Sequence, residues 1–230
     1  SEFNNGLVKS IRTGITKMLE NYQNLIIIED DICVSKYFLK YMNHGLNKYR
    51  DNKKIWHLNG FNFPSKIKKN DCFFSRVMFC WGWATWKDRW QKYIKDPLFH
   101  DPFYINNILD KKLIKELDLN SNINFFSSQI KNNMKGKYSW AIFWYVYIFL
   151  NKGLCLTPYN SITKNIGHDG SGINCKKISE IQNSPINNNP INNFPNLFLE
   201  DEYALEQMKK YIKATYNLRA KIYRKVKNYF

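Results

Sequence analysis

The chain has 230 residues, of which 35 are Lys or Arg and 19 are Asp or Glu, giving a formal net charge of +16; 44% of the residues are hydrophobic and 17% aromatic. This composition is too apolar for a chain that is disordered throughout, and it is enough for one domain with a sizeable core. No apolar run reaches the roughly 20 residues that a membrane-spanning helix needs, so this segment is not expected to be an integral membrane protein.

The cysteines indicate the cellular compartment, whereas the net charge leaves the binding partner open. The five cysteines are widely spaced and form no CxxC pair, so we expect neither a zinc site nor a disulfide framework. Unpaired cysteines are typical of proteins in a reducing compartment. Because no signal peptide is recognisable either, we expect a cytoplasmic protein. The positive charge is typical of nucleic-acid-binding proteins, but an Asn- and Lys-rich composition also follows from genomic base bias.

The first third of the chain alternates helical and extended patterns. Apolar residues at helical spacing predict a helix over residues 7–19, and the unbroken apolar run 25–28 is typical of a strand buried on both faces of a parallel sheet. Ser35 is placed to cap a helix that extends to about residue 50, and residues 55–58 form another short strand pattern. This order is that of an α/β fold.

The remainder is predicted to add further strands, helices and a variable end. Extended patterns are expected over 72–79, 154–157 and 161–165, and helices near 105–117, 124–131 and 140–151. We divide the chain into a core at 1–182, an Asn- and Pro-rich linker at 183–202 and a basic amphipathic helix at 203–230.

The basic helix at the end of the chain has two interpretations. Eight basic residues and no acidic one fall between Lys209 and Lys227, beside an apolar and aromatic stripe. Such a helix suits an anionic membrane surface, which would make the protein peripheral at the inner face of the cell membrane. Alternatively, the stripe packs on the domain and the lysines are solvated.

Three carboxylates, Glu29, Asp30 and Asp31, directly follow the apolar run 25–28. They are expected at the carboxyl end of a strand, where open α/β sheets bind ligands. Carboxylates crowded in this way repel one another unless a cation lies between them, and hard oxygen ligands favour Mg²⁺ or Mn²⁺. The alternative is that they are solvated charges at the start of a loop.

The segment from Asn24 to Ile32, with its Glu-Asp-Asp sequence, resembles the acidic motif of GT-A-fold glycosyltransferases, in the form found in N-acetylglucosaminyltransferase I and in bacterial sugar transferases. The resemblance implies a Rossmann-like mixed sheet flanked by helices. It also implies that Asp31 binds a divalent metal, Mn²⁺ or Mg²⁺, and that Glu29 and Asp30 contact a nucleoside diphosphate sugar donor.

A block of tryptophans follows, with four Trp between Trp81 and Trp90. Trp83, Trp86 and Trp90 lie at helical spacing, and the last two are expected to be structural. Trp81, Gly82 and Trp83 are the candidates for acceptor binding, since sugar rings stack on indoles and a glycine lets the backbone approach a ligand. The bacterial sugar transferases carry a similar WGWATW block.

A glycine-rich segment near residue 170 holds His168 and Asp169 side by side. Its amides suit phosphate, His168 is a candidate metal ligand and Asp169 a candidate base, although an exposed turn has the same pattern. The segment is similar to the late NIGHDGSG segment of the bacterial family. The remaining histidines are expected to be structural.

Two features depart from the family pattern. Ala141 stands where many relatives carry an Asp thought to be the catalytic base, which leaves Asp169 as the substitute. Only one helix precedes Asp31, so the units that usually hold the nucleoside are expected to be missing from the sheet.

The resemblance therefore implies a metal-dependent, inverting glycosyltransferase that transfers a sugar from a nucleoside diphosphate to a glycan or lipid-linked glycan in bacterial surface polysaccharide synthesis. No nucleic-acid partner is expected. The alternatives are a catalytically incomplete glycosyltransferase-like domain and a basic nucleic-acid-binding module.

Overall fold

The computed structural model describes residues 6–64, 67, 69, 71–137, 139–167 and 185–217. Its helices are α1 (Leu7–Asn21), α2 (Phe38–Lys48), α3 (Lys87–Ile94), the 3₁₀ helix η1 (Pro97–His100), α4 (Pro102–Ile108), α5 (Lys111–Leu117), α6 (Ser127–Met134), α7 (Ala141–Leu150) and α8 (Glu202–Tyr216). Its strands are β1 (Asn24–Ile27), β2 (Ile32–Val34), β3 (Ile55–Asn59), β4 (Cys72–Ser75), β5 (Trp83–Trp86), β6 (Leu154–Pro158) and β7 (Thr163–Asn165). The chain is thus a mixed α/β protein, as its pattern of elements predicts.

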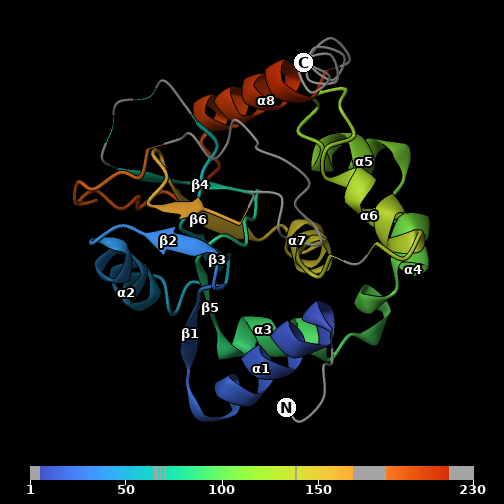
Figure 1. Ribbon diagram of the computed structural model, residues 1–230, viewed down its shortest axis with the longest axis horizontal. Coiled ribbons are helices and arrows are strands. Elements are labelled where there is room, and N and C mark those ends of the chain that lie inside the picture. Colours follow the sequence, from blue (N-terminus) through green and yellow to red (C-terminus); the bar gives the residue numbers. More distant parts are fainter. Residues whose placement is uncertain are drawn as a thin grey trace.

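Five of the strands form one mixed sheet in the order β1-β5-β3-β6-β4. Only β3 and β6 pair in parallel, and the other three pairs are antiparallel. The two short strands β2 and β7 form a separate antiparallel ribbon. Helices flank the sheet, with α2 on one side and α1, α3 and α7 on the other, while α4, α5 and α6 gather beyond α7 (Figure 1).

Each face of the sheet carries its own hydrophobic core, because successive side chains of a strand point to opposite faces. In β5, Trp83 belongs to the core shared with α1, α3, α7 and α8, whereas Ala84 and Trp86 belong to the core shared with α2. The register of β3 against β6 shifts between Ile55 and His57. This irregularity explains why Ile55 and Leu58, three positions apart, share one core.

The prediction for residues 25–28 was right about the strand and wrong about its neighbours. β1 is an edge strand that pairs antiparallel with β5, and its side chains are only half-buried. Both faces are nevertheless covered, since Leu25 and Ile27 pack against one core and Ile26 against the other. A continuous apolar run indicates that both faces of the strand are covered, but it does not show whether the neighbouring strand is parallel or antiparallel.

The tryptophan block is not helical at its start, contrary to the spacing argument. Trp83 and Trp86 lie in strand β5, and α3 begins only at Lys87. Trp86 and Trp90 are structural as expected, being 1% and 0% exposed. A separation of three residues places two side chains on opposite faces of a strand, and this is where the structure puts Trp83 and Trp86.

The segments near the end of the described chain pack on the sheet and its helices. Residues 185–200 contain no helix, as expected, but Ile191 and Phe194 are buried, so this part is not a free tether. In α8, Ala204, Met208 and Ile212 join the larger core. The apolar stripe of the basic helix therefore packs on the domain over its described half.

The predicted membrane contact of this helix also depends on residues 218–230, which lie outside the described residues, and it stays a prediction. Among the described residues, no helix has both the length and the apolarity to cross a membrane.

His57 shows how polar groups are accommodated in this core. The ring is fully buried, stacks on Trp83 with centroids 4.9 Å apart, and accepts a hydrogen bond at Nδ1 from Trp144 Nε1 at 3.2 Å. Its Nε2 lies 3.0 Å from the carbonyl oxygen of Phe79 and therefore carries the proton. Burial lowers the pKa of His57 from 6.5 to about 3, so the folded protein holds a neutral imidazole.

We predict that the stability advantage of the wild type over His57→Gln falls as the pH is lowered from 7 to 4. The unfolded chain binds a proton at His57 near pH 6.5 and the folded chain does not, which costs up to about 1.4 kcal/mol per pH unit below that value. Urea unfolding of both proteins across this range measures the difference. Glu29, whose pKa is raised in the folded state, makes the free energy of unfolding change with pH in the opposite direction. This contribution is the same in both proteins and cancels in the comparison. A difference that does not vary with pH would contradict the prediction.

Candidate functional site

Segments from four parts of the chain meet at one edge of the sheet. Ile27 pairs with Trp83, and Asn59 also pairs with Trp83, so β1 and β3 end where β5 begins. Leu58 pairs with Leu156 in the parallel direction, which brings the end of β6 to the same edge. The loops that follow β1, β3 and β6 and the loop that precedes β5 therefore gather there, which is the usual place for a ligand site in such folds.

Two glycines allow these segments to cross at close range. The Gly60 amide donates to the Gly82 carbonyl at 2.7 Å, and Gly60 in turn accepts from the amide of Ile162 at 2.9 Å. A Cβ atom on Gly60 would lie 2.7 Å from the Gly82 oxygen, and one on Gly82 would lie 2.9 Å from a methyl carbon of Thr163. Gly82 also has a φ of +70°, which favours glycine.

The close approach at Gly82 is therefore to the protein's own chain. The side chains of Thr163 and Phe38 fill the space beside its Cα, and Thr163 Oγ1 donates to the carbonyl of Trp81 at 2.8 Å. Gly82 joins the tryptophan block to β7, and its predicted role in acceptor binding stays a prediction.

The acidic cluster lies in the turn between β1 and β2. The amide of Ile32 donates to the carbonyl of Glu29 at 3.1 Å, which closes the turn. Asp30 is exposed, whereas Glu29 and Asp31 are half-buried. Burial, together with the charges of Asp31 and Asp30, raises the pKa of Glu29 from 4.5 to about 7. The carboxylates of this turn thus disfavour one another's charge, and Glu29 is partly protonated near pH 7.

Asp31 is held on one side and unpartnered on the other. Its Oδ2 accepts from Asn165 Nδ2 at 3.0 Å, and its carbonyl accepts from the amide of Ile166 at 2.8 Å. Gly167 lies so close that a Cβ atom there would come within 2.5 Å of Oδ2. Oδ1 is buried and has no hydrogen-bond partner among the described residues.

An orphaned carboxylate oxygen next to a second carboxylate fits a divalent cation. Mg²⁺ is commonly held in proteins by only one or two carboxylates together with waters and substrate phosphates, so a large cluster of ligands is not required. In the part of the chain that the structure describes, no group of three or more His, Cys, Asp or Glu side chains is arranged to hold a metal. Asp31 and Glu29 are therefore the metal-binding candidates there.

The tryptophan block divides at Gly82. Trp81 is half-buried, and its ring lies against Phe61 with centroids 4.4 Å apart. Trp83 is 0% exposed and stacks on Trp140 at 5.4 Å. The prediction that Trp83 binds an acceptor is wrong, because neither face of its ring reaches solvent; its position inside β5 makes it part of the core.

Trp81 lines an aromatic pocket of about 310 Å³. Phe61, Phe63 and Phe79 contribute to its walls, as do Phe125 and Tyr145. Cys80, also in the wall, has its pKa raised to about 12 by burial and by the charges of Glu29 and Asp31. The pocket and the acidic cluster are therefore neighbours, with Cys80 within electrostatic reach of both carboxylates.

Ala141 lines the same pocket. It is the first residue of α7, whose other residues lie almost entirely in the core. Ala141, where the resemblance led us to expect an Asp, thus faces the aromatic pocket beside Trp81. In this chain that wall offers a methyl group and no carboxylate.

His168 and Asp169 lie outside the described residues. The described chain leads directly to them, since Asn165 and Gly167 contact Asp31 and His168 follows Gly167. Sequence reasoning missed Asn165 as the residue that positions Asp31, and it missed the phenylalanines that line the pocket. Their signal was weak: isolated aromatic residues in loops do not reveal that they share one cavity.

Comparison with known proteins returns no match, either to a protein-family model or to a curated protein.

We predict that Gly82→Ala destabilises the protein more than Gly136→Ala does. Both glycines have positive φ, +70° and +76°, but a Cβ at Gly136 meets nothing within 4 Å. The control should cost about 1 kcal/mol of backbone strain, whereas crowding against Thr163 and Phe38 should add about 1 to 3 kcal/mol at Gly82. Chemical denaturation of the two variants gives the comparison, and equal losses would show that the crossing at Gly82 tolerates a side chain.

Proposed function

We propose that this protein is a metal-dependent glycosyltransferase that moves a sugar from a nucleoside diphosphate donor to a glycan or lipid-linked glycan acceptor. The observation that carries the proposal is the buried Oδ1 of Asp31, which lies beside Glu29 at the loop edge of the sheet and has no hydrogen-bond partner within the described part of the chain. Burying a carboxylate oxygen without a partner costs free energy of folding unless a cation binds to it.

On the donor side, Asp31 would hold Mn²⁺ or Mg²⁺ through Oδ1, with Asn165 fixing the orientation of the carboxylate through Oδ2. Glu29 and Asp30 would contact the sugar nucleotide, and His168 is proposed as a further metal ligand. When bound, the cation offsets the negative charge that develops on the departing diphosphate.

On the acceptor side, the aromatic pocket beside Trp81 supports binding of a sugar ring or of an apolar group attached to it. The acceptor oxygen forms a bond to the anomeric carbon of the donor while the bond from that carbon to the diphosphate oxygen breaks. The hydroxyl proton passes to a carboxylate. We propose Asp169 for this role, two residues beyond Gly167, which contacts Asp31.

A catalytically incomplete domain is the second candidate, and Ala141 is the observation that favours it. The pocket wall that would face the acceptor carries a methyl group at this position. Such a protein would bind the metal and the sugar nucleotide without turning the donor over. Turnover assays on a protein that has passed the binding test below separate the two candidates.

We predict that Mn²⁺ with a nucleoside diphosphate stabilises the wild type and not Asp31→Asn. At about 100 times their dissociation constants, the ligands should raise the melting temperature by roughly 5 to 10 °C. Asp51→Asn is the matched control, because it removes the same charge from a side chain that is 90% exposed. Differential scanning fluorimetry with Mn²⁺, UDP and GDP, alone and combined, makes the measurement.

Three results of this titration would contradict the proposal. These are a shift of equal size in Asp31→Asn, the absence of any shift in the wild type, and stabilisation by oligonucleotides alone, the last of which would favour a nucleic-acid-binding module.

We predict that Trp81→Ala raises the KM for the acceptor by about fivefold or more and changes the KM for the donor by less. The reason is that Trp81 lines the aromatic pocket, whereas the donor contacts lie in the acidic turn. Phe103→Ala, which removes an aromatic ring that is 55% exposed and outside this pocket, should change neither value. Initial-rate kinetics with one substrate varied at a time provide the test, and equal effects on both substrates would make Trp81 a structural residue.

A further inference from the structure

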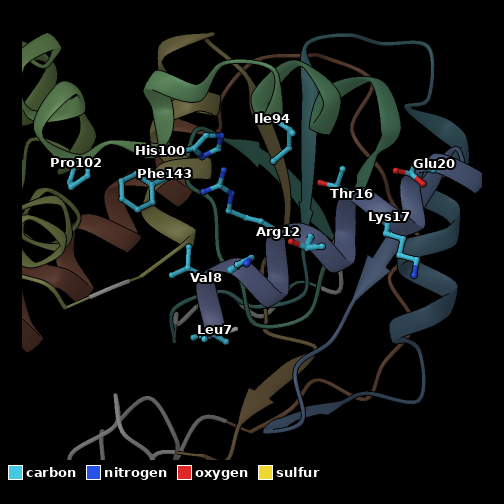
Figure 2. Close-up of a pocket in the computed structure, with 13 residues that line it drawn as sticks. Leu7, Val8, Arg12, Thr16, Lys17, Glu20, Ile94, His100, Pro102 and Phe143 are labelled. Atoms are coloured by element: carbon cyan, nitrogen blue, oxygen red, sulfur yellow. The ribbon is translucent and has the colours of Figure 1, made fainter. Parts of the chain in front are cut away.

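A second and larger pocket lies on another part of the molecule. It encloses about 940 Å³ between α1 and the segment formed by α3, η1 and α4, and it is closed on one side by Phe143 of α7. Figure 2 shows Arg12 rising from α1 toward His100, with Phe143 nearby and Thr16, Lys17 and Glu20 further along the helix. None of its lining residues lines the aromatic pocket beside Trp81.

Polar groups in and beside this pocket are buried without hydrogen-bond partners. Among the described residues this holds for Arg12 Nε in the wall of the pocket and for the hydroxyl of Tyr93 beside it. The Tyr93 and His100 rings are in contact, with centroids 4.8 Å apart. Buried donors of this kind cost free energy unless something accepts from them, and here two different side chains are left unsatisfied close together.

The charge of the pocket indicates that its ligand is an anion. Three basic side chains, Lys9, Arg12 and Lys17, line it against one carboxylate, that of Glu20. Burial and the neighbouring charge of Arg12 lower the pKa of His100 to about 4, and a hydrogen bond from the ring to the main chain of Ile94 opposes this only weakly. His100 is therefore a neutral ring at pH 7, and the basic side chains of the pocket would repel a cationic ligand.

The other walls of the pocket are apolar and favour a ligand with an apolar part. Leu7 and Val8 of α1 and Ile94, Pro102 and Phe143 opposite present apolar surface. Lys9, Arg12 and Lys17 offer N–H donors, and Thr13 and Thr16 add hydroxyls at the wall. This number of donors matches the oxygens of a phosphate better than the two oxygens of a carboxylate.

We infer that this pocket binds a phosphate group that carries an apolar chain or ring, with Arg12 contacting the phosphate next to the His100 ring and the Leu7, Ile94 and Phe143 side chains contacting the apolar part. The site is separate from the proposed transferase site, and its occupation requires neither a divalent metal nor a sugar nucleotide.

The test is isothermal titration calorimetry with octyl phosphate, kept below its critical micelle concentration, in the absence of divalent metal. Inorganic phosphate and 1-octanol are the comparison ligands, since each carries one half of the proposed chemistry. Octyl phosphate should bind saturably and more tightly than either, and inorganic phosphate binding as tightly as octyl phosphate would overturn the apolar half of the assignment.

Substitutions then locate the site. Arg12→Gln should weaken octyl phosphate binding by about tenfold or more. Arg50→Gln, which removes an exposed guanidinium outside the pocket, should leave it unchanged. Equal affinity in these two variants, or no saturable binding by the wild type, would overturn the proposal.

A second readout protects the test against a folding defect in Arg12→Gln. The imidazole resonances of His100, assigned by their loss in His100→Gln, should shift when octyl phosphate is added to the wild type. Octyl phosphate binding that leaves these resonances in place would put the ligand elsewhere and overturn the assignment.

Discussion

The crossing of backbone segments at Gly60 and Gly82 is the constraint on which the rest of the candidate site depends. The 2.7 Å hydrogen bond between these residues joins the end of β3 to the start of β5, and the Thr163 side chain packs against both glycines. β7, which contains Thr163, then pairs with β2 and so brings Asn165 to Asp31. Without room for this crossing, the acidic turn, the tryptophan block and the approach to His168 would have no fixed relation to one another.

The buried aromatic core provides the rigidity behind this edge. Trp83 stacks on His57 and on Trp140, and Trp144 donates to His57, so rings from β3, β5 and α7 fix one another in place. The consequence reaches the site, because Trp81 precedes β5 by two residues and Ala141 begins α7. Aromatic residues of the core thus fix the strands that carry the pocket's own aromatic lining.

Sequence patterns predicted the existence of most elements and the location of the acidic turn, since an apolar run such as residues 25–28 packs against other apolar side chains and the charged residues after it mark its end. They failed where the outcome depends on distant partners. The order of strands made β1 an antiparallel edge, burial on both faces of β5 removed Trp83 from any ligand, and the close approach of Thr163 gave Gly82 a structural role. In each case the contacting residues are far apart in the sequence, so a local pattern cannot predict the contact.

The proposed function depends most on which ion binds Oδ1 of Asp31. A crystal of the protein grown with Mn²⁺ and UDP, with diffraction recorded at an energy where manganese scatters anomalously, places the ion directly. We expect an anomalous peak within coordination distance of Asp31 Oδ1, with the diphosphate oxygens bound to the same ion. A peak elsewhere, or none in a crystal that contains bound nucleotide, would contradict the assignment of this turn as a metal and donor site.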